Sequence, residues 1–447
     1  MKREIVAGID LGTTKICAII GEIAADNKID ILGFGKADSK GITRGMVNNI
    51  LQTADSIKEA VEIASNRAGI NVTSFNVGVA GDHIKNLKYK NYVTIANKEA
   101  GITEDDLIRL DNDIRSIKKE PDKKILHIIP EEYIVDDVYR SIDNPIGMQG
   151  SKLEAINNII TAETRYLDNI QRAIEKAGYS INNFVLQPLA SANSVLEESE
   201  KEVGVMLIDI GGGTTDIAIF ENKKLKYSKV YGIGGNMVTN DIRETLNLIQ
   251  GVAEELKVKY GFATLSAVLK NEEITIPGIG AKKNMVVSVA TLTEIIYYRM
   301  RELFYFINKD VEALGLKKII KGGIVLTGGG SLLKGLTELS DEVFGIPARI
   351  GIPLNLGEGL SREIETPEFA TVTGLIRPIE GLSSHNPIVL TIEKKMSQQA
   401  KVQPSPTVLN IEEEKVVEEK VEEKIETKPK EKKESIFTKI KNFFDQL

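Results

Sequence analysis

The chain has very few of the residues that build disulfide frameworks and metal clusters. It contains one cysteine, Cys17, and three histidines at positions 83, 127 and 385. A single cysteine excludes an internal disulfide, and the histidines lie too far apart in sequence for a metal-ligand motif. This composition indicates a reducing compartment, so we expect a cytosolic protein.

Long hydrophobic runs and excess positive charge are also missing. No apolar run approaches the roughly 18 residues of a membrane-spanning helix, and Asp10 interrupts the apolar stretch 5–9, which argues against a signal peptide. The net charge of −7 gives no electrostatic reason to expect nucleic acid as a partner. We therefore expect any membrane contact to be peripheral.

Two common nucleotide-binding motifs are absent as well. The sequence contains no Gly-x-x-x-x-Gly-Lys-Ser/Thr, and no Gly-x-Gly-x-x-Gly follows a predicted strand. These absences exclude a P-loop and disfavour a dinucleotide.

The chain does have the length and composition of a multidomain globular protein. Its 447 residues, 42% of them hydrophobic, are too many for one compact core. Predicted strands and helices alternate from residue 2 to about 390, including a helix from residue 50 that stops at Gly69. Residues 391–434 are mostly Glu, Lys, Gln and Pro, which cannot bury enough apolar surface to fold. We interpret them as a solvated linker.

One strand–turn–strand motif occurs twice, far apart in the chain. Apolar residues 5–9 lead into Asp10-Leu-Gly-Thr-Thr, and residues 205–208 lead into Asp209-Ile-Gly-Gly-Gly-Thr-Thr. Each turn continues into a second apolar strand, so each copy is predicted to be a hairpin. A repeat period this long indicates duplicated lobes and not a solenoid.

The two turns carry the groups that a magnesium–nucleotide complex needs. Glycines without a Cβ let the backbone approach phosphates and take positive φ angles, and threonines add hydroxyls. We expect Asp10 and Asp209, each at a strand end, to hold magnesium through water. A single turn of this kind is an ordinary β-turn, so the second copy strengthens the interpretation.

A third element completes the pattern. Residues 324–331, Ile-Val-Leu-Thr-Gly-Gly-Gly-Ser, predict a strand, a glycine turn and the start of a helix. Such a turn lets the backbone pass close to a base and a ribose. The three elements, in this order, indicate an ATP-binding cleft between two lobes.

This combination resembles the phosphate-1, phosphate-2 and adenosine motifs shared by actin, Hsp70 chaperones and sugar kinases. Longer segments are similar to the FtsA family of bacterial cell-division proteins within that superfamily. These segments are residues 8–22, 41–48, 81–84, 209–216, 234–241 and 324–331, and the resemblance spans about residues 4 to 380. An insert near residues 83–162 lies where that family carries its subdomain 1C, which favours FtsA over actin-like cell-shape filaments.

The resemblance implies an α/β, two-lobed actin/Hsp70-like ATPase fold with an FtsA-type insert. The expected units are lobe 1 (subdomain 1A, residues 1–82 plus 163–200), the insert subdomain 1C (83–162), lobe 2 (subdomain 2A, 201–241 plus 311–390), subdomain 2B (242–310), the disordered charged linker (391–434) and a C-terminal amphipathic membrane-targeting helix (435–447). Within the insert, we expect strands at 89–95 and 125–129 and a helix with Thr103 as its N-cap and Leu107, Leu110, Ile114 and Ile117 on one face.

The family's cofactors are ATP and Mg²⁺, and its contacts carry over residue by residue. The implied nucleotide-binding residues are Gly12, Thr13, Thr14, Lys15, Gly211, Gly212, Gly213, Thr214, Thr215, Gly328, Gly329, Gly330 and Ser331, with metal roles for Asp10 and Asp209. Lys15 is expected to reach a phosphate, although a lone lysine at a turn is also consistent with a solvated charge. Asp216 is expected either to cap its turn or to touch the ligand.

Two further assignments rest on position alone. Gln187 lies in a segment that resembles the connection where superfamily members orient the attacking water, and it is the catalytic candidate; a simple loop is the alternative. Arg299 and Glu302 match the position of adenine-pocket residues, and a solvent-facing ion pair is the alternative.

The last residues of the sequence have helical hydrophobic spacing. Ile436, Phe437, Ile440, Phe443, Phe444 and Leu447 fall on one face at about 100° per residue. Polar residues occupy the other face, and Lys432 and Lys433 add attraction to anionic lipid. A helix that packs on protein is the alternative, but the stripe follows a charged linker. This context, and the family's terminal targeting helix, favour the membrane.

The function implied by the resemblance is an ATP-binding, actin-like cell-division protein that polymerises head to tail and anchors the FtsZ ring to the membrane. Its expected place is the cytoplasmic face of the inner membrane at the division site, with at most slow ATPase activity. Expected partners are FtsZ, further copies of the chain, the anionic membrane surface and other division proteins bound through subdomain 1C, but no nucleic acid. The alternatives are a pilus-assembly ATPase relative or a small-molecule kinase of the superfamily, which would need a carboxylate base that no motif marks.

Overall fold

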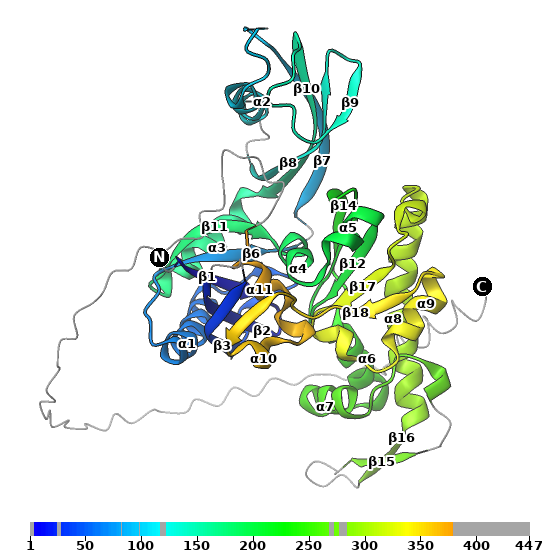
Figure 1. The fold of residues 1–447 in the computed structure, drawn as a ribbon. Helices are drawn as coiled ribbons and strands as arrows, with labels where there is room; N and C mark the ends of the chain where they lie inside the picture. Colours follow the sequence, from blue (N-terminus) through cyan, green and yellow to red (C-terminus); the bar gives the residue numbers. More distant parts are fainter. Residues whose placement is uncertain are drawn as a thin grey trace, which may run out of the picture.

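A computed structural model describes residues 4–24, 28–81, 83–97, 99–116, 122–267, 272–276 and 284–378. The predicted linker, the C-terminal helix and the last position of the predicted insert helix, Ile117, lie outside these residues. Figure 1 shows two sheet-containing lobes side by side, with the insert projecting from them. In the described part of the chain, no helix combines the length and apolarity needed to cross a membrane.

Lobe 1 is built on a six-stranded mixed sheet, in the order β11-β6-β1-β2-β3-β19. Its strands are β1 (Glu4–Leu11), β2 (Lys15–Ile23), β3 (Ile29–Asp38), β6 (Ser74–Val79), β11 (Ser180–Leu186) and β19 (Leu356–Gly359). The first predicted hairpin is confirmed, because β1 and β2 pair antiparallel from Glu4–Ile23 to Leu11–Ile16. A short hairpin, β4 (Ile42–Thr43) with β5 (Met46–Val47), follows β3.

Five helices accompany this sheet. They are α1 (Ile50–Ala68), α3 (Thr164–Lys176), α4 (Gln187–Val195), α10 (Ser361–Ile364) and α11 (Ala370–Gly374). The predicted stop of α1 is confirmed, since Gly69 takes the left-handed conformation at φ 66°. The Asn49 side chain accepts a hydrogen bond from the Gln52 N–H at the other end of the helix. Local sequence signals therefore set both ends of α1.

Lobe 2 repeats the arrangement with a five-stranded sheet, β14-β13-β12-β17-β18. Its strands are β12 (Val205–Ile210), β13 (Thr215–Glu221), β14 (Lys224–Tyr231), β17 (Ile324–Thr327) and β18 (Ala348–Ile350). Its helices are α5 (Glu198–Val203), α6 (Gly235–Leu246), α7 (Gln250–Tyr260), α8 (Val289–Ala313) and α9 (Leu336–Phe344), and a small hairpin joins β15 (Glu273–Ile276) to β16 (Met285–Ser288). The second predicted hairpin is thus confirmed as β12 with β13.

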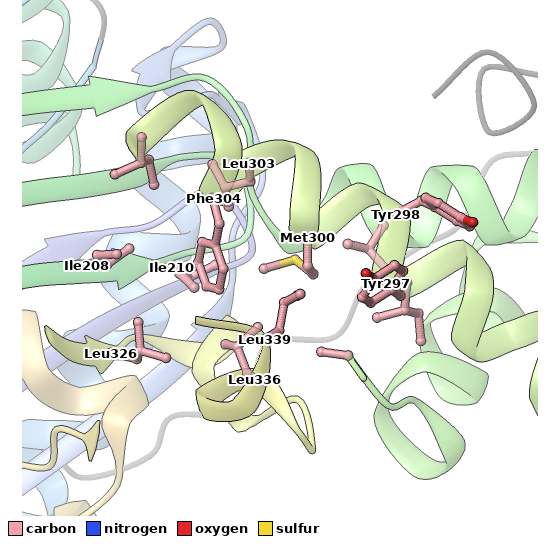
Figure 2. Close-up of a cluster of buried hydrophobic side chains, with 14 of the residues drawn as sticks. Ile208, Ile210, Tyr297, Tyr298, Met300, Leu303, Phe304, Leu326, Leu336 and Leu339 are labelled. Carbon is pink, nitrogen blue, oxygen red and sulfur yellow. The ribbon is translucent and has the colours of Figure 1, made fainter. Parts of the chain in front are cut away.

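The lobe 2 core forms where α8 covers the sheet. Met300, Leu303 and Phe304 of α8 are at most 1% exposed and belong to the same cluster as Ile208 of β12 and Leu339 of α9 (Figure 2). Burying large apolar side chains of this kind stabilises the fold by roughly 1.5–3 kcal/mol each. This packing stabilises the carboxyl end of β12, where the second glycine turn begins.

The third predicted element differs in its last part. After β17 and Gly328 comes a 3-10 turn, Gly329–Leu332, and the α-helix α9 begins only at Leu336. Gly330 would collide with the Ile210 side chain if it carried a Cβ, at 2.4 Å. The backbone therefore passes tightly over the end of β12 before it can start a helix.

The insert is a four-stranded sheet, β7-β10-β8-β9, with one helix. Its elements are β7 (Lys85–Thr94), α2 (Glu104–Ser116), β8 (Lys123–Val135), β9 (Tyr139–Ile142) and β10 (Lys152–Glu163). The predicted strands and helix face are confirmed, since Leu110 and Ile114 are buried and Leu107 packs against the cluster that contains Leu110. Thr103 directly precedes α2, as expected for its N-cap residue. Its backbone N–H and its hydroxyl both donate to the Asp106 carboxylate, at 2.8 and 2.9 Å.

The insert contacts both lobes. Ile129 and Ile160 share a buried cluster with Leu186 of lobe 1 and Phe220 of lobe 2. The Asn158 amide also donates to the Leu225 carbonyl of β14 at 2.9 Å. The three units are thus joined by one hydrophobic cluster.

Candidate nucleotide-binding site

A cleft of about 370 Å³ lies where the glycine turns of the two lobes meet. Of the residues predicted for the site, it is lined by Asp10, Gly12, Thr13, Thr14, Lys15, Gln187, Asp209, Gly211, Gly212, Gly213, Thr214, Gly328, Gly329 and Gly330. The structure therefore brings together residues from three distant parts of the chain.

The turn after β1 and the turn after β12 touch each other across the cleft. A Cβ added to Gly212 would lie 1.8 Å from the Thr14 hydroxyl oxygen, and one added to Gly213 would lie 2.5 Å from that of Thr13. None of Gly12, Gly211, Gly212 or Gly213 has a positive φ, so the expectation of left-handed geometry at these positions is wrong. Close approach between the lobes is what requires glycine at 212 and 213.

Positive φ occurs instead in the third turn. Gly328 has a φ of 80°, and a Cβ there would lie 2.2 Å from a carboxylate oxygen of Asp209. Both the conformation and the space exclude a side chain. The adenosine-type turn thus packs directly against the carboxylate at the end of β12.

Three carboxyl groups, of Asp10, Asp209 and Asp216, line this cleft, and those of Asp209 and Asp216 are buried. Burial, followed by the charge of Asp209, raises the pKa of Asp10 to about 7. Burial also raises the pKa of Asp209, against hydrogen bonds from Ser191 at 2.5 Å and Thr371 at 3.2 Å. The pKa of Asp216 is raised well above its usual value by burial and by these two neighbours.

This arrangement fits a hydrated magnesium ion. Among the described residues, no group of three His, Cys, Asp or Glu side chains is placed to hold a metal directly. Magnesium usually keeps several waters and needs only one or two carboxylates, a role that Asp10 and Asp209 would fill. Asp216 lines the cleft too, and its Oδ1 is buried without a hydrogen-bond partner in the described structure. A magnesium ion with its water shell would not need three direct protein ligands, and its waters would supply the hydrogen-bond partner that Asp216 Oδ1 lacks.

Gln187 lies at the first position of α4 and reaches the metal-facing side of the cleft. Its amide nitrogen donates to Asp10 Oδ1 at 2.8 Å. Its backbone is held from the insert, because the N–H of the preceding Leu186 donates to His127 Nε2 at 3.1 Å. The amide is therefore held next to the Asp10 carboxylate, and the catalytic role of Gln187 remains a prediction.

Lys15 is neither free nor simply solvated. Its ammonium forms an ion pair with Glu368 at 2.8 Å, and Lys36 pairs with the same carboxylate. Both lysines and the carboxylate are partly exposed. A phosphate contact by Lys15 remains a prediction, and it would have to replace this pair.

Four predicted site residues do not line the cleft. Arg299 is buried and binds Asp241 at 2.5 and 2.9 Å, and it also pairs with Glu302. The hydroxyls of Thr215 and Ser331 donate to backbone carbonyls at 2.8 and 2.7 Å, which stabilises their turns. The nucleotide roles of these four residues remain predictions.

Several lining residues were not predicted from the sequence. Glu254 and Lys257 of α7 pair at 2.7 Å, and the Lys257 ammonium donates to the Gly235 carbonyl at 3.2 Å. Val258, Leu332 and Leu333 add apolar surface to the same cleft. The spacing of 254, 257 and 258 on one helix face was visible in the sequence, but nothing there indicated that this face meets the glycine turns.

Two sheets joined at a cleft by paired hairpin turns define an actin-like ATPase fold, a class of nucleotide-binding protein. A search of solved structures agrees on the fold: the PilM-PilN type IV pilus biogenesis complex matches with a TM-score of 0.58 and 16% identity, over 83% of this chain and 97% of that one.

Sequence comparisons define the family. The model described as "Cell division protein FtsA" matches residues 206–374, and the "SHS2 domain inserted in FTSA" matches residues 81–161. The cell division protein FtsA of Neisseria meningitidis is 38% identical over 84% of this chain and 90% of that protein. FtsA of Escherichia coli is 33% identical over 88% and 94%. The chain belongs to the FtsA family of cell division proteins.

Proposed function

We propose that this FtsA-family chain binds ATP with Mg²⁺, polymerises, and anchors the FtsZ ring to the cytoplasmic face of the membrane through its C-terminal amphipathic helix. The nucleotide sets the contact between the two lobes, and turnover is slow. The protein's product is the position of the division ring.

The observation that carries the proposal is the contact between the two glycine turns across the cleft. Gly212 and Gly213 of lobe 2 lie against Thr14 and Thr13 of lobe 1. Phosphates bound here contact N–H groups and hydroxyls from both turns. A triphosphate therefore bridges the lobes, whereas an empty cleft leaves them free to separate.

The opposite part of the lining suits a nucleoside. The side chains of Val258 and Leu332 are 67% and 57% exposed, so they provide uncovered apolar surface for a base. The Glu254 carboxylate, held by Lys257, is an acceptor for ribose hydroxyls. Polar phosphate contacts and an apolar base contact thus occur in one cleft.

The site predicts slow turnover. Gln187 orients a water, but an amide cannot accept the proton that the water must lose. Asp10 already receives the Gln187 amide and faces the metal. With Gln187 unable to act as the base and Asp10 assigned to the metal, hydrolysis is slow and the ATP-bound state persists.

We also propose the subdomain boundaries given under Sequence analysis. The match of the inserted-domain model to residues 81–161 supports the boundaries of subdomain 1C. Helix α8 extends to Ala313, so subdomains 2A and 2B share it across the proposed boundary at 310.

The nucleotide part is tested by titrating the full chain with MgATP in a calorimeter. Replacing Asp10 or Asp209 with Ala removes a charge that faces the metal, and we expect each change to weaken binding by about tenfold or more. Asp55→Ala, on the exposed face of α1, is the matched control. Equal affinity of the parent and both cleft variants would show that the metal assignment is wrong.

The adaptor part is tested by sedimentation with anionic phospholipid vesicles and purified FtsZ. We expect FtsZ to pellet with the vesicles only when this chain and MgATP are present. FtsZ that stays in the supernatant would refute the adaptor. Stoichiometric transfer of phosphate to a small metabolite would support the kinase alternative.

A further inference from the structure

Glu368 is an acidic residue at the phosphate-binding end of a cleft built for an anion. It lies in the 3-10 turn Pro367–Phe369 and lines the cleft beside Lys15, which directly follows the Gly12–Thr14 turn. One carboxylate oxygen pairs with Lys15 at 2.8 Å, and the other pairs with Lys36. Burial raises the pKa of Glu368, but hydrogen bonds from the two lysines outweigh this and hold the pKa below its usual range.

The backbone around Glu368 is held on both sides, so the carboxylate can move only by rotation about its own side-chain bonds. The Pro367 carbonyl accepts the Gly328 N–H at 3.1 Å and the Thr327 hydroxyl at 3.3 Å. On the other side, Phe369 is 2% exposed and packs edge-on against Phe34 at 5.3 Å. The lysine side chains are longer than that of Glu368, so a rotamer change moves the ammonium group further than the carboxylate.

We propose that the Glu368 carboxylate binds the Lys15 ammonium in place of the terminal phosphate while the cleft is empty, and that ATP displaces the carboxylate when it binds. This inference rests on the proposed nucleotide function of the cleft. When a triphosphate binds, the Lys15 ammonium exchanges the carboxylate for a phosphate oxygen. Glu368 thereby determines how strongly ATP binds without contacting the base or the ribose.

Lys36 provides the positive charge that Glu368 needs once Lys15 binds the phosphate. It does not line the cleft, yet it pairs with Glu368 and lies 4.3 Å from the centroid of the Phe369 ring. After Lys15 leaves, Lys36 still neutralises the carboxylate beside the phosphates. Without Lys36, Glu368 would hold Lys15 more strongly and would repel the nucleotide more, because a single cation would have to serve both anions.

The test is a double-variant cycle in the full chain, with MgATP and MgADP affinities measured by calorimetry. We expect Glu368→Gln to tighten MgATP binding about fivefold, as expected for removing a partly screened competing charge, and to change MgADP less. Lys36→Met keeps the apolar stem and should weaken MgATP binding about twofold to threefold. In the double variant the Lys36 effect should vanish, because the carboxylate on which it acts is gone.

Glu363→Gln is the matched control, since Glu363 pairs with Arg67 at 3.3 Å and Arg67 stacks on Phe34. It should leave both affinities unchanged, and thermal unfolding checks that every variant is folded. Weaker or unchanged MgATP binding by Glu368→Gln would overturn the inference, as would an equal gain for MgADP or a Lys36 effect that persists in the double variant. A parent chain that binds neither nucleotide would overturn the proposed function and this inference with it.

Discussion

Gly212 is a residue where one methyl group decides whether the lobes can meet. A Cβ added to Gly212 would lie 1.8 Å from the Thr14 hydroxyl oxygen, whereas a Cβ added to Gly251 of α7 would have no neighbouring atom within 4 Å. We expect Gly212→Ala to weaken MgATP binding about tenfold, because overpacking costs about 1–3 kcal/mol and here acts on the closed cleft. Gly251→Ala should leave the MgATP affinity unchanged. Calorimetric titration checks both, and equal affinities would mean that the lobes need not touch.

His127 is a second residue with a measurable signature. Burial lowers the pKa of His127 to about 4, and its neutral Nε2 accepts the Leu186 N–H. At pH values between about 4 and the ordinary pKa of about 6.5, His127 is protonated in the unfolded chain but not in the folded chain. Stability contributed by the neutral ring is therefore complete above pH 6.5 and decreases as the pH falls towards 4, by about 3 kcal/mol at most.

The check on His127 is urea unfolding at pH 7 and pH 4.5. His127→Gln keeps an acceptor near the same place but cannot titrate. The free energy of unfolding should therefore fall less between the two pH values in this variant than in the parent. An identical fall in both chains would show that other groups cause the acid sensitivity.

Among the elements, α6 and α8 are joined by a buried ion pair. Arg299 of α8 and Asp241 of α6 have side chains 5% and 6% exposed. Arg299→Met leaves two carboxylates, Asp241 and Glu302, without their cation, and we expect a loss of about 3–5 kcal/mol in the free energy of unfolding. Arg301→Met, which breaks a partly exposed pair with Glu342 at 3.8 Å, should cost less than about 1 kcal/mol.

Denaturant unfolding and MgATP titration of the same variants decide the role of Arg299. A stable Arg299→Met chain that loses nucleotide affinity would favour the adenine-pocket prediction. An unstable chain would instead identify the pair as a structural link between the helices.

The elements also show how far local sequence reaches. The Asn49 cap, the Gly69 stop and the continuous apolar runs of the two hairpins are short-range signals, and all appear in the structure. The predicted start of the helix after the third glycine turn was too early, since α9 begins at Leu336. The close approach of Gly330 to Ile210, where an added Cβ would collide, joins segments far apart in the chain. Short-range patterns do not encode such contacts.

For the molecule as a whole, the proposed membrane attachment depends on residues 435–447. Phe443→Glu with Phe444→Glu places two charges on the predicted apolar face and should abolish pelleting with anionic vesicles. MgATP binding should persist, because the cleft lies in the described lobes. Thr438→Glu with Asn442→Glu puts the same charge on the polar face and should retain most of the binding. Equal pelleting of both double variants would contradict an amphipathic anchor.

The whole molecule also determines how the insert is held. Ion pairs Lys226–Glu131 at 3.0 Å and Lys224–Asp143 at 2.6 Å link β14 of lobe 2 to the insert, which leaves the chain within lobe 1. The insert therefore contacts both lobes, and any change in the separation of the lobes would change its packing.

Local sequence specifies the duplicated hairpins, the glycine turns and the carboxylates at the strand ends, because continuous apolar runs and turn chemistry act over a few residues. Local motifs also led to the right family. Packing between distant segments is what brings Glu254 and Lys257 into the cleft, keeps Arg299 out of its lining, and pairs Glu368 with Lys15. These contacts join residues far apart in the chain, and they depend on how two separately folded sheets meet, a geometry that no local pattern specifies.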